Sequence, residues 1–218
     1  MIDNLELVGK RLIFQPDIFY YIQVIKRKKD NPKMEGTDKV LHSRFITSLK
    51  QLKEEFETVK VLCSAFNARA YISLTPRSIT KFGKESLKYM TEKVLSDCYT
   101  KALSWPERIA LYHEVLYRDK SIGHKPWWIV DIDNDSWVEP IRSLLEKNGA
   151  TIVDAIPTPN GKHLLIESFD IKKIKEYLFD KNDFGYRLPG GEEFYIKMAA
   201  NTILYANPYI CNDEKENL

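Results

Sequence analysis

Apolar and polar positions alternate along the chain in a way that predicts a mixture of strands and helices. Residues 18–25 (IFYYIQVI) are aromatic and β-branched, as is typical of a strand. Residues 48–67 carry apolar side chains at the three-and-four spacing of an amphipathic helix, with Ser48 as its cap. Further strands are expected at 40–47, 68–74, 127–130, 151–156, 163–166, 193–197 and 202–205, and further helical segments at 79–117 (in at least two pieces), between Ser136 and Gly149, and at 171–179.

From residue 68 onward these elements follow the order strand, helices, strand, helix, hairpin, helix, strand. This order is typical of an α+β fold in which a mostly antiparallel sheet is backed by helices, related to the split βαβ plan. Residues 1–67 are expected to form a hairpin and helix unit that packs on a core domain of residues 68–210. Residues 1–11 carry little signal, and residues 211–218 are expected to be a frayed tail.

Length and composition suit an ordinary protein with a hydrophobic core. The chain has 218 residues, of which 44% are hydrophobic and 29% charged, which suits one large domain or a small domain with an appendage. No stretch approaches the ~20 apolar residues of a membrane span, and the N-terminus has no basic-then-apolar signal, so no membrane contact is expected. The three cysteines are widely spaced and odd in number, which predicts a reducing, cytoplasmic location.

The charged positions limit where a nucleic acid can bind. The formal net charge is only +2, so a surface for nucleic acid has to be a local patch. One such patch is the run Lys26-Arg27-Lys28-Lys29, at the predicted tip of the N-terminal hairpin. Two interpretations of this run stay open: lysines that protect a strand edge, or cations that contact a phosphate backbone.

Two carboxylates at the end of a buried strand are the first candidates for chemistry. The apolar run 127–130 leads into Asp131 and Asp133, whose spacing puts both side chains on one face of a strand. A divalent cation would relieve their mutual repulsion, and Mg²⁺ and Mn²⁺ prefer such oxygen ligands. In nucleotidyl and phosphoryl transfer, such a cation orients the phosphates and stabilises developing charge. In the alternative interpretation, the acids cap the helix that follows, with Ser136 as N-cap and Glu139 as its capping-box partner.

A tight turn supplies the second candidate group. Residues 157–163 (PTPNGKH) combine small polar residues with a glycine, so that backbone N–H groups can approach an anion. Lys162 and His163 add side-chain donors, and Asn160 belongs to the same turn. A histidine beside a hairpin turn is often structural. The nearness of this one to the two aspartates, through one helix and one strand, favours phosphate binding.

Three of these segments resemble motifs of the archaeo-eukaryotic primase superfamily. WWIVDID is similar to its first catalytic motif, TPNGKHLLI to its second, and AYISLTPR to the early strand of the primase-polymerase branch. The resemblance covers residues 68–207 and implies an RRM-like catalytic sheet with an additional α/β unit in front of it. It also implies that Asp131 and Asp133 bind Mg²⁺ or Mn²⁺, and that His163 contacts the phosphates of an incoming nucleotide.

The chain departs from the family at the third motif, which places another carboxylate near the metal. Glu193 is the nearest acid on a predicted strand and the candidate third metal ligand, while Asp170 is a weaker choice. Asn201 stands in the stretch where an acid is expected. Further candidates for nucleotide or phosphate binding are Arg77, Asn160, Lys162 and Lys197.

The resemblance implies metal-dependent nucleotidyl transfer of the primase or polymerase type, acting on nucleotides and single-stranded nucleic acid. It further implies DNA replication in a phage, virus or mobile element, with a helicase or other replication proteins as partners. Two alternatives stay open. A nucleotide- or nucleic-acid-binding module on the same fold would stack bases on outward-facing tyrosines such as Tyr71, Tyr195 and Tyr205. A haloacid-dehalogenase-type phosphatase also carries a strand-end Asp-x-Asp, but that motif normally opens its domain and needs a later acidic pair that this chain does not convincingly offer.

Overall fold

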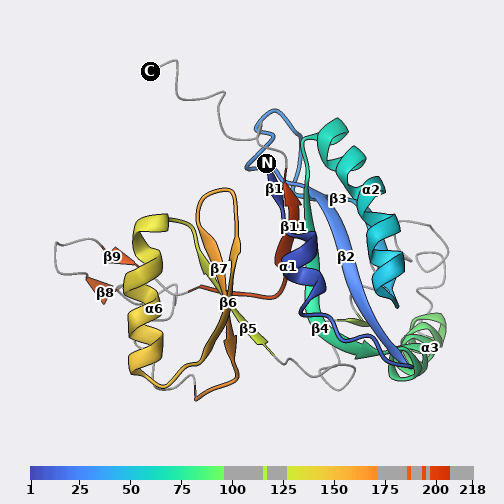
Figure 1. Cartoon of the computed structure of the whole chain (residues 1–218). Coiled ribbons are helices and arrows are strands. Elements are labelled where there is room, and N and C mark those ends of the chain that lie inside the picture. Colours follow the sequence, from blue (N-terminus) through green and yellow to red (C-terminus); the bar gives the residue numbers. More distant parts are fainter. Residues whose placement is uncertain (96–114, 117–126, 171–185, 188–192, 195–196, 207–218) are drawn as a thin grey trace.

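The computed structural model describes residues 1–95, 115–116, 127–170, 186–187, 193–194 and 197–206. These residues form an α+β fold built on two antiparallel sheets. Figure 1 shows the two sheets next to each other, with helix α2 (Leu49–Phe66) at one side of the pair and helix α6 (Val138–Lys147) at the other. The predicted fold class is confirmed at this level.

The first sheet combines strands from the start, the middle and the end of the chain. Within the described residues its order is β1 (Ile2–Asp3), β11 (Thr202–Ala206), β4 (Arg69–Ser78), β2 (Ile18–Lys26) and β3 (Lys39–Ile46), with every neighbouring pair antiparallel. Strand β2 is therefore an interior strand, and β3 lies at an edge. The predicted division at residue 67 runs through this sheet, because β4 pairs with β2 and β11 pairs with β1.

Three helices accompany this sheet in the described part of the chain: α1 (Leu5–Gly9), α2 and α3 (Ile79–Leu95). The predicted cap of α2 is confirmed, since the Gln51 backbone N–H donates to Ser48 Oγ at 3.1 Å. Asn67 ends α2 in the left-handed conformation, with φ of 48°. Helix α3 begins directly after β4. Of the second helical piece predicted before residue 117, only residues 115–116 are described, and both are helical.

The second sheet carries the candidate aspartates and histidine. Its order within the described residues is β10 (Lys197–Ala199), β5 (Trp127–Ile132), β7 (Lys162–Glu167) and β6 (Ile152–Pro157), again antiparallel throughout. Helix α6 connects β5 to β6, and β6 and β7 form the predicted hairpin. The helix predicted at 171–179 and the tail at 211–218 lie outside the described residues.

The start of α6 differs from the prediction. Ser136 is not its N-cap: a 3₁₀ turn, η2 (Asp135–Trp137), comes first, and α6 has no side-chain cap at Trp137. The cap of the turn is Asn134, whose Oδ1 accepts from the Ser136 N–H at 3.0 Å and from Ser136 Oγ at 2.9 Å. An asparagine side chain can satisfy the N–H group two residues on, so the chain turns earlier than the capping-box pattern indicates.

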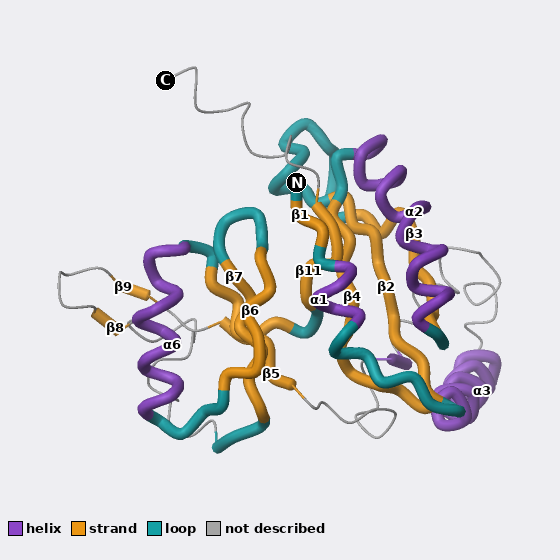
Figure 2. Tube along the Cα trace, in the orientation of Figure 1, coloured by secondary structure: helices purple, strands orange, loops and turns teal. Residues whose placement is uncertain are grey.

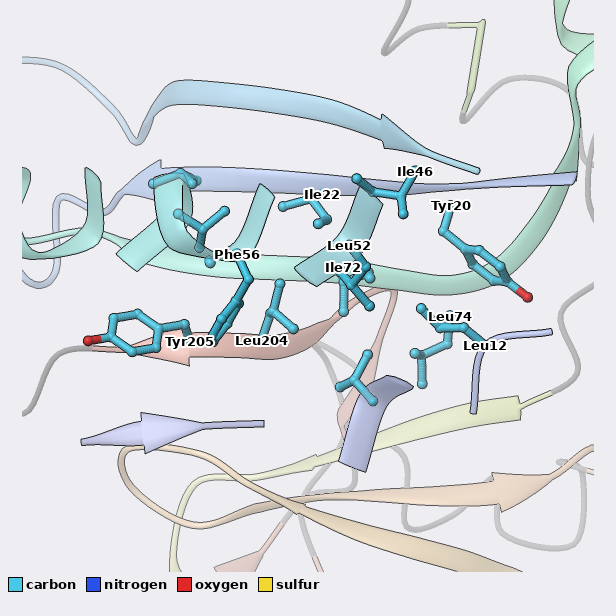
Figure 3. Close-up of a cluster of buried hydrophobic side chains, with 14 of the residues drawn as sticks. Leu12, Tyr20, Ile22, Ile46, Leu52, Phe56, Ile72, Leu74, Leu204 and Tyr205 are labelled. Carbon is cyan, nitrogen blue, oxygen red and sulfur yellow. The ribbon is translucent and has the colours of Figure 1, made fainter. Parts of the chain in front are cut away.

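One hydrophobic core joins the two sheets. It contains Ile22 and Ile72 of the first sheet, Phe56 of α2, and Ile129 and Leu165 of the second sheet, each at most 2% exposed. Figure 3 shows the part of this core that lies between α2 and the first sheet. Smaller clusters lie under α6 and between α3 and β2. Because the core is shared, the sheets hold a fixed position relative to each other.

The remaining described strands, β8 (Tyr186–Arg187) and β9 (Glu193–Phe194), pair only with each other. Figure 2 shows them beyond α6, on the side away from the first sheet. The loop between β2 and β3 and the turn between β6 and β7 lie at the same end of the molecule in this view. In the described part of the chain, no helix has the length and apolar character that a membrane crossing requires.

Candidate functional site

Asp131 and His163 lie side by side because β5 and β7 pair in register. The two residues are direct cross-strand partners, which places their side chains on the same face of the sheet. His163 Nε2 is 3.2 Å from Asp131 Oδ1. The His163 side chain is 6% exposed, whereas the Asp131 side chain keeps 28% of its surface in contact with solvent. The histidine is thus a buried wall of the site, and the carboxylate reaches the solvent.

A residue of the other sheet fixes the histidine ring. Thr202, at the start of β11, is fully buried, and its Oγ1 is 3.0 Å from His163 Nδ1. With Nδ1 held by the hydroxyl, Nε2 faces Asp131. The orientation of the imidazole therefore depends on contacts from both sheets.

The turn between β6 and β7 packs directly on the Asp131–Asp133 segment. Thr158 N–H donates to the Gly161 carbonyl at 2.9 Å, and Gly161 N–H donates to Thr158 Oγ1 at 3.1 Å, which closes the turn. A Cβ atom at Gly161 would overlap the carbonyl oxygen of Ile132. Only a residue without a side chain allows this approach, and it brings Asn160 to the two aspartates.

These groups line one pocket of about 100 Å³ between the two sheets. The second sheet and its turn contribute Asp131, Asp133, Asn160 and His163, and the connection between β10 and β11 contributes Asn201. The first sheet contributes Arg27, Arg69 and Tyr71. The pocket therefore has an acidic wall on one sheet and a basic wall on the other.

The basic wall contains a buried ion pair and a half-buried phenol. Arg69 Nη2 is 2.5 Å from Asp30 Oδ1, and both side chains are at most 6% exposed. Tyr71 accepts a hydrogen bond from Arg27 Nη1 at 3.3 Å. Burial raises the pKa of Tyr71 above its ordinary value, so the phenol stays neutral. Burial works to lower the pKa of Arg27, but its interactions with Tyr71, Asp30 and Asp38 outweigh that effect and raise it, so Arg27 is a cation.

The structure brings together Asp131, Asp133, His163 and Asn160 among the predicted site residues. Lys162 is not among the residues that line the pocket; it neighbours His163 on β7, and successive strand residues point to opposite faces. Lys197 is the backbone partner of Asp131 on β10.

Two predicted residues lie elsewhere. Arg77 sits near the far end of β4, eight residues and roughly 25 Å along the strand from Arg69. There its Nη1 donates to the Leu116 carbonyl oxygen at 2.6 Å. The backbone of Glu193 belongs to β9, in the separate pair with β8 rather than in the sheet of Asp131. Asp170 follows the opposite end of β7 from His163 and is exposed.

The sequence pattern did not single out Arg69, Thr202 or the place of Arg27 in the pocket. Arg69 could have been noticed as a charged residue inside an apolar strand, since charges are seldom buried without a partner. Thr202 gives no signal at all, because a threonine is ordinary in a strand.

Asp131 and Asp133 are the residues of the acidic wall that could contribute oxygen ligands to a divalent cation. Within the described residues, no group of three or more His, Cys, Asp or Glu side chains is arranged to hold a metal ion. Mg²⁺ is commonly bound by one or two carboxylates together with substrate phosphates and water. Asp131 and Asp133 supply that number of carboxylates, and Asp131 is open to solvent.

Comparison of the chain with protein-family models, with curated proteins and with solved structures gave no match.

Proposed function

We propose that this protein is a metal-dependent nucleotidyltransferase of the primase-polymerase type. The observation that carries the proposal is that Asp131, Asp133 and His163 line one pocket between the two sheets. Asp131 and Asp133 belong to the segment that resembles the family's first motif, and His163 belongs to the segment that resembles its second. The proposal includes nucleotides and single-stranded nucleic acid as substrates, replication proteins as partners, and a location inside the cell.

The topology of the second sheet supports the same proposal. The connection β5-α6-β6-β7 and the strand order β10-β5-β7-β6 support a split βαβ plan, on which RRM-like domains are built. In that plan, the first and third strands are neighbours at the centre. Here those strands are β5 and β7, which carry Asp131 and His163.

In the proposed reaction, Asp131 and Asp133 hold one Mg²⁺ or Mn²⁺ ion. When bound, the ion orients the phosphates and stabilises the negative charge that develops during the in-line displacement. Asn160, which lines the same pocket, would help to position water or substrate oxygens.

His163 acts as a hydrogen-bond donor to phosphate. If the ring is neutral and Thr202 Oγ1 donates to Nδ1, the proton is on Nε2; if the ring is protonated, both nitrogens carry one. In either state the Nε2–H faces Asp131 Oδ1, and a phosphate bound beside that carboxylate would share the same N–H as a second acceptor. A charged or neutral imidazole in this place offers the phosphate a fixed donor at little reorganisation cost.

A second candidate function is nucleotide or nucleic-acid binding without chain extension. The observation that favours it is Asn201, which lines the pocket at the end of β10 where the family's third carboxylate is expected. A neutral amide offers one oxygen ligand but no charge, so it balances a second cation less well than a carboxylate does.

Primer synthesis and extension with Mn²⁺ test the proposal. Asp131→Asn and His163→Ala should each reduce product formation roughly hundredfold or more, the loss typical of removing a group that stabilises the transition state. Asp135→Asn is the matched control, because it removes the same charge from an exposed residue in the following turn. Full activity in either site variant would contradict nucleotidyl transfer at this pocket. A wild-type protein that shifts single-stranded DNA or RNA but makes no product with any metal would favour the binding function.

A further inference from the structure

The residues that contact the ligand in the proposed reaction all belong to the second sheet and its turn, and the basic wall on the first sheet has no role in it. Its exposed cation is Arg27, from the basic run 26–29 that follows β2. Lysines protect sheet edges only where they lie on edge strands. β2 is an interior strand between β4 and β3, so edge protection does not explain this run.

The turn that carries Arg27 is fixed by buried polar contacts. Asp30 pairs with Arg69, and its backbone carbonyl accepts from Asn67 Nδ2 at 2.9 Å. Asn31 Nδ2 donates to the carbonyls of Arg27 and Asn67, both at 3.0 Å. Asn67 is the left-handed residue that ends α2. The turn is thereby tied to both α2 and β4, and the Arg27 backbone is held at the mouth of the pocket.

The charge of the wall resides on Arg27. Arg69 is neutralised by Asp30 in the buried pair, whereas Asp38 lies 3.7 Å from Arg27 Nε and is half exposed, so its attraction is screened. The Arg27 side chain is 35% exposed. Its guanidinium has further N–H donors beyond the one that reaches Tyr71. Arg27 can therefore contact a ligand without giving up its place against Tyr71.

The lining of the pocket indicates what this ligand is. The wall opposite the two aspartates presents the Arg27 guanidinium and the Tyr71 hydroxyl, which are groups that bind anionic oxygens. A phosphate that carries a divalent cation offers negative oxygens to Arg27 and the cation to Asp131 and Asp133.

We propose that Arg27 is the phosphate-binding residue of the wall opposite Asp131 and Asp133, and that Tyr71 and the Asp30–Arg69 pair position it. The phosphate would be coordinated by the metal on one side and held by the guanidinium on the other, in the fork geometry that suits arginine. This inference rests on the proposed function. In this arrangement, the second sheet binds the metal-coordinated side of the phosphate, and Arg27 of the first sheet binds the opposite side.

Two kinds of ligand offer such a phosphate: a nucleoside triphosphate, or the 5′-phosphate of a nucleic-acid strand. Calorimetric titrations with Mn²⁺ present separate them. One arm uses tripolyphosphate and a nucleoside triphosphate; the other compares a short single strand that carries a 5′-phosphate with the same strand ending in a 5′-hydroxyl. A polyphosphate subsite predicts tight binding in the first arm and no 5′-phosphate preference in the second, and a 5′-phosphate subsite predicts the reverse.

Arg27→Gln should lower the affinity for the preferred ligand roughly tenfold or more, as expected for the loss of one charge-assisted hydrogen bond. Lys29→Gln is the matched control, since it removes the same charge from an exposed residue of the same turn. Arg27→Lys keeps the charge but not the fork, and should recover only part of the affinity. Mn²⁺ binding in the absence of phosphate should be the same in all three variants. Thermal unfolding of each variant shows whether the turn stays folded.

Equal affinities for wild type and Arg27→Gln would overturn the inference, as would an equal loss in Lys29→Gln, which would indicate only general attraction. These results differ from a failure of the proposed function. That failure would appear as Mn²⁺ and phosphate binding that Asp131→Asn leaves unchanged, or as a wild-type protein that binds neither, and it would remove the basis for a role of Arg27 as well.

Discussion

His163 and Gly161 illustrate how single residues build the pocket. His163 is oriented by Thr202 from one sheet and by Asp131 from its own. Gly161 works through the absence of a side chain, which lets the β6–β7 turn lie against the backbone of β5. His163 thus provides a hydrogen-bond donor at a fixed position, and Gly161 determines how closely Asn160 can approach the two aspartates.

Gly161→Ala should therefore disturb both stability and the site. The added methyl group meets the Ile132 carbonyl, which is backbone at the end of β5, where Ile132 pairs with Lys162, and cannot move aside easily. Overpacking of this kind typically costs about 1–3 kcal/mol. Urea denaturation should detect the lower free energy of unfolding. A separate titration should show weaker Mn²⁺ binding than in the wild type.

Gly83→Ala provides the control, because a Cβ at Gly83 in α3 would meet no atom within 4 Å. That change should leave the protein as stable as before, or up to about 1 kcal/mol more stable, since alanine favours a helix. Equal stability of the two alanine variants would show that the turn can shift away from β5.

At the scale of elements, Asp17 organises the passage from β4 into α3. It has a positive φ of 67°, and its carboxylate accepts from Ser78 Oγ at 2.6 Å and from the Thr80 N–H at 2.7 Å. The Asp17 carbonyl accepts from the Ile79 N–H at 2.8 Å. A residue distant in sequence thus caps the first turn of α3, and no loop is needed between strand and helix.

This cap predicts a pH dependence of stability. The hydrogen bonds from Ser78 and then Thr80 lower the pKa of Asp17 below its ordinary value of 3.8. As pH falls, Asp17 therefore takes up a proton in the unfolded chain before it does so in the folded protein. The stabilising contribution of the ionised carboxylate is complete well above pH 3.8 and is lost below that pH.

Asp17→Asn tests this, because asparagine also tolerates a positive φ but carries no charge. The difference in melting temperature between wild type and Asp17→Asn should be largest near pH 6 and should shrink as pH falls toward 3. A difference that stays constant over this range would rule out the charge of Asp17 as the cause. Asp135→Asn, in the separate turn η2, should show no such trend.

At the scale of the whole molecule, the N-terminal segment fastens the two sheets together. Asn4 is buried, and its Nδ2 donates to the carbonyls of Pro157 in β6 and Ile203 in β11, both at 2.9 Å. Arg11 binds Asp154 of β6 through Nε at 3.0 Å and Nη2 at 2.8 Å. These contacts and the shared core keep the acidic and basic walls of the pocket opposite each other.

The sequence predicted the parts of this arrangement that depend on local pattern. The strand before Asp131 and the hairpin that carries His163 follow from apolar runs and turn residues, and their convergence follows once β5 and β7 pair. The roles of Asn4 and Thr202 could not be predicted, because each depends on a partner about 150 or 40 residues away. The two arginines show the same limit of prediction from local sequence. The motif resemblance predicted Arg77 as a phosphate-binding residue, but Arg77 lies elsewhere. Arg27 lines the pocket because of how the strands pair.

The most direct test of the account is to locate Mn²⁺ in crystals grown or soaked with Mn²⁺ and a nucleoside triphosphate, using its anomalous scattering. The account predicts a peak within ligand distance of the Asp131 and Asp133 carboxylates, with phosphate density between His163 and Arg27, and no such peak in Asp131→Asn. A Mn²⁺ ion bound elsewhere on the wild-type chain, or an empty pocket at saturating Mn²⁺ and triphosphate, would contradict it.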